Sequence, residues 1–143
     1  MTLENLLYRI AQYGINKKLI KYSAAGSSLY QLNTATIKKY PVLFTSPSGS
    51  HTVNTDLTRF TLTLFYLDRL EFDNSNDIEI FSVAVEALKD IIRGLSNIEG
   101  IIAVSEEYAI TNFTETERLN DKLAGAYTTI EIVVSNDFIC EQE

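Results

Sequence analysis

The sequence is poor in the residues on which most catalytic and metal centres depend. Its 143 residues include one cysteine, Cys140, one histidine, His51, and no tryptophan. A single cysteine excludes a disulfide framework and a zinc site built from cysteines. A nucleophile activated by histidine would have to use His51, and no G-x-S-x-G motif accompanies it. We therefore expect no enzyme activity and no catalytic residue.

The chain also lacks long apolar runs and phosphate-binding motifs. No run reaches the roughly 18 apolar residues of a transmembrane helix. The first residues include an acid, Glu4, and no basic region, so they do not predict a signal peptide. Gly26 and Gly49 lie in serine-rich turns but form neither a G-x-G-x-x-G motif nor a phosphate-binding loop. We expect no membrane partner and no cofactor.

One oxygen-rich stretch is a candidate metal site. It contains Asp68, Asp73, Asn74, Asn76 and Asp77. A calcium loop that begins at Asp73 needs glycine at its sixth position and glutamate at its twelfth, but the chain has Ile78 and Ala84 there. We interpret the stretch as a turn that caps the following helix, and we expect no metal site.

The net charge of −7 is unevenly distributed along the chain. Residues 1–60 contain seven basic and two acidic groups, whereas residues 61–143 contain five basic and seventeen acidic groups. Opposite charges on two parts of one small domain suit copies that meet head to tail, although a chance distribution over a solvated surface also gives this pattern. The lysines Lys17, Lys18 and Lys21 form no recognised motif, and the acidic total argues against specific binding of nucleic acid.

Apolar periodicity and capping residues predict two helices. Thr2 is a suitable N-cap for a first helix over residues 3–13, which would end at Gly14. Asn76 predicts the start of a second helix that runs to about Leu95. The apolar stripe expected to face the core consists of Ile78, Phe81, Val85, Leu88, Ile92 and Leu95. The charged residues on the opposite side, expected to be solvated or to contact a partner, are Glu86, Lys89, Asp90 and Arg93.

Alternating apolar residues predict a long central strand over residues 57–70. The residues that would share its fully covered face are Phe60, Leu62, Leu64 and Tyr66. The other face turns apolar only toward its end. A strand over residues 42–45 precedes a turn at residues 46–50, which predicts a hairpin with the extended run from His51. A further strand region is expected to begin at residues 101–104 and to extend through residues 108–110 to Phe113. The last strand is expected over residues 126–134, with a short helix or a loop over residues 114–124.

Residues 15–40 are the hardest to interpret. Short strands are expected at residues 19–22 and 28–32. A connection of this length is typical of a functional or interface loop, and an irregular surface arm without a partner is the alternative. Together these patterns predict one α+β domain over residues 1–143. It would have a small antiparallel sheet, both helices on one face and a flexible acidic tail at about residues 135–143.

Several segments resemble one protein family in their succession of strand, turn and helix. These segments are Tyr40–Phe44, Phe60–Leu70, Asp73–Asn76, Glu79–Ser82 and Asp121–Val134. They are similar to tail-completion and tail-terminator (neck) proteins of tailed bacteriophages, of the type seen in phages of gut Bacteroidetes, including crAss-like phages. The resemblance covers most of residues 3–134, contains no catalytic signature and is weakest over residues 15–36.

The resemblance implies a structural virion protein. Such proteins form head-to-tail homo-oligomeric rings, expected here as a hexamer or dodecamer, which join the head portal to the tail and complete or terminate the tail. The implied partners are further copies of the chain, portal or adaptor proteins and tail proteins, with non-specific contact to DNA in the channel. The protein would occur in the neck or tail of the virion, and in the host cytoplasm during assembly.

Charge and loop composition, taken with the resemblance, suggest candidate contacts between subunits or rings. These residues are Lys17, Lys18, Lys21, Ser46, Pro47, Ser48, Gly49, Ser50, Glu86, Asp90 and Arg93. The competing interpretation is a small α+β ligand-binding or assembly-chaperone domain that is absent from the virion. A binding domain would need a pocket with convergent polar groups, and the sequence by itself identifies none.

Overall fold

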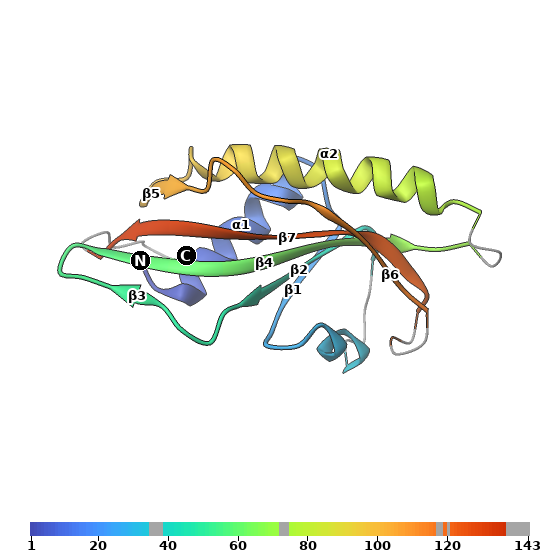
Figure 1. Ribbon diagram of the computed structural model, residues 1–143, viewed down its shortest axis with the longest axis horizontal. Coiled ribbons are helices and arrows are strands. Elements are labelled where there is room, and N and C mark those ends of the chain that lie inside the picture. The colour runs from blue at the N-terminus through green and yellow to red at the C-terminus, as the bar shows by residue number, and fades with distance from the viewer. Residues whose placement is uncertain (35–38, 72–74, 117–118, 120, 137–143) are drawn as a thin grey trace.

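Residues 1–34, 39–71, 75–116, 119 and 121–136 are the part of the chain that the computed structural model describes. Its elements in chain order are α1 (Leu3–Asn16), β1 (Tyr22–Ala25), the 3₁₀ helix η1 (Leu29–Thr34), β2 (Val42–Pro47), β3 (Thr52–Val53), β4 (Leu57–Arg69), α2 (Asp77–Leu95), β5 (Ile101–Val104), β6 (Thr111–Glu115) and β7 (Leu123–Ser135) (Figure 1). The α+β class predicted from the sequence is confirmed. The predicted tail lies almost wholly outside the described residues.

Two long strands form the centre of a single sheet. β4 and β7 pair antiparallel along their whole length, from Leu57 opposite Ser135 to Arg69 opposite Leu123. The strand order is β1-β2-β4-β7-β5, with β3 beside β4 and β6 beside β7. The sheet is mixed, and not antiparallel throughout as predicted, because β1 runs parallel to β2. The connection over residues 26–41 brings the chain back to the end of the sheet where β1 began, so β2 runs in the same direction.

The predicted hairpin is present, with a longer connection than expected. β2 pairs antiparallel with β4 over all six of its residues. The connection contains β3, which pairs with the start of β4. Ser46 and Pro47 therefore belong to β2, and only Ser48–Ser50 lie in the exposed loop.

Both α-helices pack against the same face of the sheet, and Figure 1 shows α2 lying along it. The residues buried beneath them are, as predicted, Phe60, Leu62, Leu64 and Tyr66. On the other face of β4, Thr61 and Thr63 are half-buried and Leu67 is fully buried, so this face becomes apolar only toward the end of the strand. A side chain such as Leu62 contributes about 1.5–3 kcal/mol when it is fully buried.

The buried face of α2 differs from the predicted stripe. Three residues of the predicted stripe are buried: Leu88, Ile92 and Leu95. Phe81 and Val85 are half-buried, and Ile78 is exposed. The other buried residues of the helix are Ile80, Ala84, Ala87, Ile91 and Gly94. Three of these are small and let the helix approach its neighbours closely. A methyl group on Gly94 would lie 1.9 Å from the hydroxyl oxygen of Tyr13 in α1. Close approach therefore selects the buried face.

The starts of the two helices agree with the prediction to different degrees. The Thr2 hydroxyl accepts a hydrogen bond from the Asn5 N–H at 3.1 Å, as an N-cap should. Asn76 precedes α2 as predicted, but its side chain does not cap the helix. It accepts from the Glu71 N–H and donates to the Arg69 carbonyl oxygen. Asn76 thus ties the end of β4 to the start of α2.

The segment between β1 and β2 covers part of the opposite face of the sheet. Residues 28–32 are predicted as a strand, but residues 29–32 instead form the first part of η1. Leu29 and Leu32 are three residues apart and so lie on one side of a 3₁₀ helix. Both are buried in a cluster that includes Phe44 of β2. The strand predicted at residues 19–22 also lies later, as β1.

The last part of the sheet is shifted from the prediction. β7 starts before the predicted strand, and Gly125 lies within it. A methyl group on Gly125 would lie 1.7 Å from the carbonyl oxygen of Tyr66, so this position needs glycine. The strand region predicted over residues 101–113 is divided in the structure: β5 forms its start, and β6, at Thr111–Glu115, overlaps its end. The predicted helix or loop at residues 114–124 falls partly on residues that are not described.

Candidate functional site

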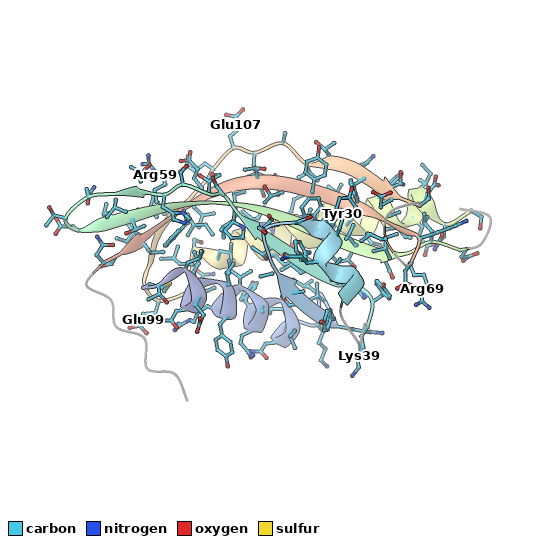
Figure 2. All side chains as sticks on the ribbon, turned by 90° about the horizontal axis from the view of Figure 1, so that it is seen from below. Tyr30, Lys39, Arg59, Arg69, Glu99 and Glu107 are labelled. Carbon is cyan, nitrogen blue, oxygen red and sulfur yellow. The ribbon has the colours of Figure 1, made fainter. Side chains whose placement is uncertain are left out.

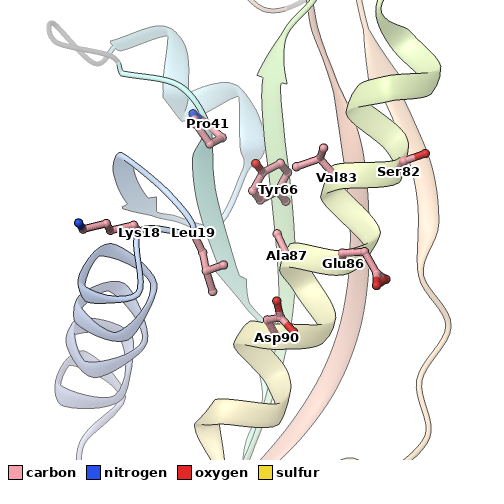
Figure 3. Close-up of a pocket in the computed structure, with 9 residues that line it drawn as sticks. All are labelled: Lys18, Leu19, Pro41, Tyr66, Ser82, Val83, Glu86, Ala87 and Asp90. Carbon is pink, nitrogen blue, oxygen red and sulfur yellow. The ribbon is translucent and has the colours of Figure 1, made fainter.

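A shallow groove lies between the end of α1 and the middle of α2, with a volume of about 560 Å³ (Figure 3). Leu19 lies on its α1 side, Val83 and Ala87 lie on its α2 side, and Pro41 and Tyr66 lie between them. The lining is mostly apolar. Such a surface favours an apolar side chain or a small apolar ligand.

The α1 side of the groove is built by an unusual helix end. α1 continues past the predicted stop at Gly14, which is buried against Ile20. The helix ends at Asn16 with Lys17 as its C-cap, and the next residue, Lys18, has a φ of 60° in the left-handed region. The Lys18 N–H donates to the Ile15 carbonyl oxygen, and the Leu19 N–H donates to that of Gly14, both at 3.0 Å. This is a Schellman motif with lysine at the position that glycine usually occupies.

Tyr66 is the titratable residue in the floor of the groove. Its side chain is only 3% exposed. Burial, together with the nearby Asp68 carboxylate, raises the pKa of the Tyr66 phenol to about 12. The phenol is therefore uncharged at neutral pH and cannot act as a base there. The floor offers a shaped apolar surface with one hydroxyl group.

The structure brings the three predicted lysines together with a fourth. Lys17, Lys18 and Lys21 are all exposed around the start of β1. The Lys21 N–H donates to the Pro41 carbonyl oxygen at 2.9 Å, which places exposed Lys39, two residues before Pro41, beside this group. We call Lys17, Lys18, Lys21 and Lys39 the basic edge, because β1 is the outermost strand on this side of the sheet. Within the described residues, none of the four forms an ion pair.

The predicted charged side of α2 is largely neutralised by pairs within the helix. Lys89 Nζ lies 2.8 Å from a carboxylate oxygen of Glu86, and Arg93 lies 3.6 Å from Asp90. Glu86 and Asp90 also border the groove. Exposed pairs of this kind contribute at most about 1 kcal/mol each, so they would exchange readily for a partner's charges.

The predicted contact segment at residues 46–50 is separate from the lysines. Its first two residues end β2, whereas Pro41 and the groove lie at the opposite end of that strand. Six strand residues span about 20 Å. The Ser48 N–H donates to the Thr61 carbonyl oxygen at 2.8 Å, which holds the start of the exposed loop against β4. The two predicted contact regions therefore cannot form one site.

The other edge of the sheet, formed by β5 and β6, carries exposed residues that were not predicted as contacts from the sequence. β5 pairs with β7 through a register shift between Ile101 and Ala103, which makes Ile102 the extra residue of a β-bulge. Ile102 is 57% exposed. The exposed Glu106 and Glu107 follow in the segment that connects β5 to β6. We call Ile102, Glu106 and Glu107 the acidic edge.

Hydrogen bonds of Ser105 and Ala109 fix the connecting segment to β7. The Glu131 N–H donates to the Ser105 hydroxyl at 2.8 Å, and the Thr128 hydroxyl donates to the Ala109 carbonyl oxygen at 2.6 Å. The acidic edge is thus held on the sheet. Two consecutive isoleucines in a short strand were the available sequence signal, because neighbouring side chains in a strand cannot share one face.

The remaining candidates from the sequence form no site among the described residues. The His51 ring packs edge-on against Phe60, with 4.9 Å between ring centroids. Cys140, Asp73 and Asn74 lie outside the described residues. Among the residues that are described, no group of three histidine, cysteine, aspartate or glutamate side chains could hold a metal ion.

Comparison with family models and with curated proteins found no match to this chain. Within the described ranges, no helix combines the length and apolar character that crossing a membrane requires. The function is therefore inferred from the surfaces above and from the resemblance in the sequence.

Proposed function

We propose that the protein is a structural virion protein of a tailed bacteriophage. It forms a homo-oligomeric ring of six or twelve copies in the neck or tail, joins the head portal to the tail, and completes or terminates the tail. The segments at residues 40–44, 60–70, 73–76, 79–82 and 121–134, which resemble tail-completion and tail-terminator proteins, support this assignment. The chain is not an enzyme in this proposal, and its surfaces serve assembly.

One observation carries the proposal. The sheet ends in β1 on one side and in β5 and β6 on the other, and these two sides bear exposed charges of opposite sign. Open sheet edges are sites at which other chains can add, and proteins normally cover or protect them. In a head-to-tail ring each copy covers one edge of each neighbour. A small sheet that is covered on one face by helices and open at both edges suits that role.

The exposed loop Ser48–Ser50 supports contacts above and below the ring. It lies at the end of β2 away from the groove, so it remains accessible when neighbours occupy the two edges. Portal or adaptor proteins and tail proteins are the partners in this proposal. Non-specific contact with DNA that passes through the channel is also part of this proposal.

The test is made on the phage itself. We expect mass spectrometry of purified particles to detect the chain in fixed proportion to the portal protein. Interrupting its gene should yield DNA-filled heads without attached, complete tails in electron micrographs. Complete, infectious particles that lack the chain would contradict the proposal.

The groove supports a second candidate function, a small ligand-binding or assembly-chaperone domain that is absent from the virion. Its volume of about 560 Å³ lies within the range of small-molecule sites. A ligand that binds only the folded chain would raise the melting temperature. A ligand-dependent rise that Val83→Asp abolishes, together with absence of the chain from particles, would favour this function over the ring.

A further inference from the structure

Two groups of exposed charges of opposite sign lie on opposite sides of the sheet. The exposed lysines of the basic edge gather around the start of β1, and Glu106 and Glu107 lie beyond β7 on the other side of the sheet. Figure 2 shows Lys39 and Glu107 on opposite sides of the molecule. None of these residues forms an ion pair with another described residue, so their charges are available to a partner. This separation favours association of unlike edges and disfavours association of like edges.

Apolar surface is also divided between the two edges. On the acidic edge, Ile102 at the bulge is an exposed apolar side chain that borders a second groove, which Ile92 and Tyr108 also line. Beside the basic edge, the groove exposes Leu19 and Val83, the latter to 50%. Each edge thus carries exposed apolar surface beside its charges. A contact between two different surfaces of the same molecule is heterologous and repeats from copy to copy.

We infer that the acidic edge of one copy docks on the basic edge of the next, with Ile102 in the groove between Leu19 and Val83, an inference that rests on the self-assembly in the proposed function. Glu106 and Glu107 then face Lys18 and Lys21 of the neighbouring copy. Each copy uses both edges once, so the contact extends into a ring or a filament.

A second copy is the occupant that these observations favour. Both halves of the contact, the lysines with the groove and the glutamates with Ile102, are present on one chain. The two edges lie at opposite ends of the strand order, so they cannot satisfy each other within one molecule. A different protein would need to match only one edge and would leave the other edge without a partner.

Charge reversal on each edge tests the contact in the full-length chain. The acidic-edge variant is Glu106→Lys/Glu107→Lys, and the basic-edge variant is Lys18→Glu/Lys21→Glu. Light scattering at low salt should show an association constant at least about tenfold lower for either variant, because like charges then face each other. Mixing the two variants should restore association through alternating copies. A variant with all four substitutions should associate with itself again.

Two controls separate the proposed contact from general effects of charge and hydrophobicity. Asp56→Lys/Glu79→Lys changes the net charge as much as the acidic-edge variant but alters exposed residues that belong to neither edge. It should associate like the wild-type chain. Ile102→Ser should weaken association at least about tenfold, whereas Ile78→Ser, which alters an exposed isoleucine elsewhere, should not.

Three results would overturn the inference. Wild-type association that neither reversal weakens would place the contact elsewhere and leave the proposed ring intact. Reversals that weaken association without recovery in the mixture would show that the edges do not face each other. A wild-type chain that stays monomeric at low salt and high concentration would also contradict the inference, whereas the composition of the virion still decides the proposed function.

Discussion

Lys18 links the stability of the chain to its proposed assembly. Its φ of 60° is a conformation that costs an L-residue about 1–2 kcal/mol and costs glycine almost nothing. Replacing lysine by glycine removes this cost, but about 0.5–1 kcal/mol of the gain is lost because glycine increases the conformational freedom of the unfolded chain. Lys18→Gly should therefore raise the free energy of unfolding by about 0.5–1 kcal/mol. Lys18→Ala keeps the strain and should stay close to wild type.

Urea denaturation at high salt, where contacts between copies are screened, measures this difference on the isolated chain. With an m-value of about 2 kcal/mol/M, the midpoint of Lys18→Gly should lie about 0.3–0.5 M above that of Lys18→Ala. At low salt both variants should associate less tightly than wild type, by up to about fivefold, because both lack the charge. A Lys18→Gly chain that is no more stable than Lys18→Ala would refute the reasoning about the helix end. Unchanged association of both would remove Lys18 from the contact.

Two glycine positions, the buried Tyr66 and the exposed edge charges give further predictions. Gly125→Ala should lower the stability by about 3 kcal/mol or more, because the new methyl group would meet the backbone of β4, whereas Gly49→Ala, in open space, should be neutral in the same denaturation assay. Between pH 10 and 12 the unfolded chain loses the Tyr66 proton while the folded chain retains it, so the wild type should lose on the order of 2 kcal/mol relative to Tyr66→Phe; parallel stability curves would contradict the raised pKa. Raising the salt from about 0.05 M to 0.5 M should lower the native mass in light scattering, since the edge charges are exposed, and a salt-independent mass would argue against charge-driven assembly.

The parts of the fold predicted from the sequence are those that neighbouring residues determine. The alternation of apolar residues from Phe60 to Leu67 indicates which face of β4 is buried, because successive side chains of a strand point to opposite faces. The side of α2 that faces the sheet could not be predicted in this way, since apolar residues surround much of the helix. Ala84, Ala87 and Gly94 decide it through close contacts with elements distant in the sequence.

The candidate surfaces were predictable to a similar extent. The lysines near the start of β1 stood out as a cluster in the sequence. Their proposed counterpart did not, because seventeen acidic residues spread over residues 61–143 give no indication of which ones share an edge. The parallel direction of β1 and the bulge at Ile102 depend on how strands pair, which local patterns do not specify. The groove likewise arises from the approach of α1 to α2.

The central claim is that copies of this chain meet head to tail through opposite edges of the sheet. Cross-linking with a flexible thiol-reactive reagent tests it, in a Cys140→Ser background that carries both Lys21→Cys and Glu107→Cys. We expect a ladder of covalent oligomers that ends at six or twelve copies, and no products from either single-cysteine variant alone. Dimers formed by a single-cysteine variant, or no ladder from the double variant in assembled material, would contradict the claim.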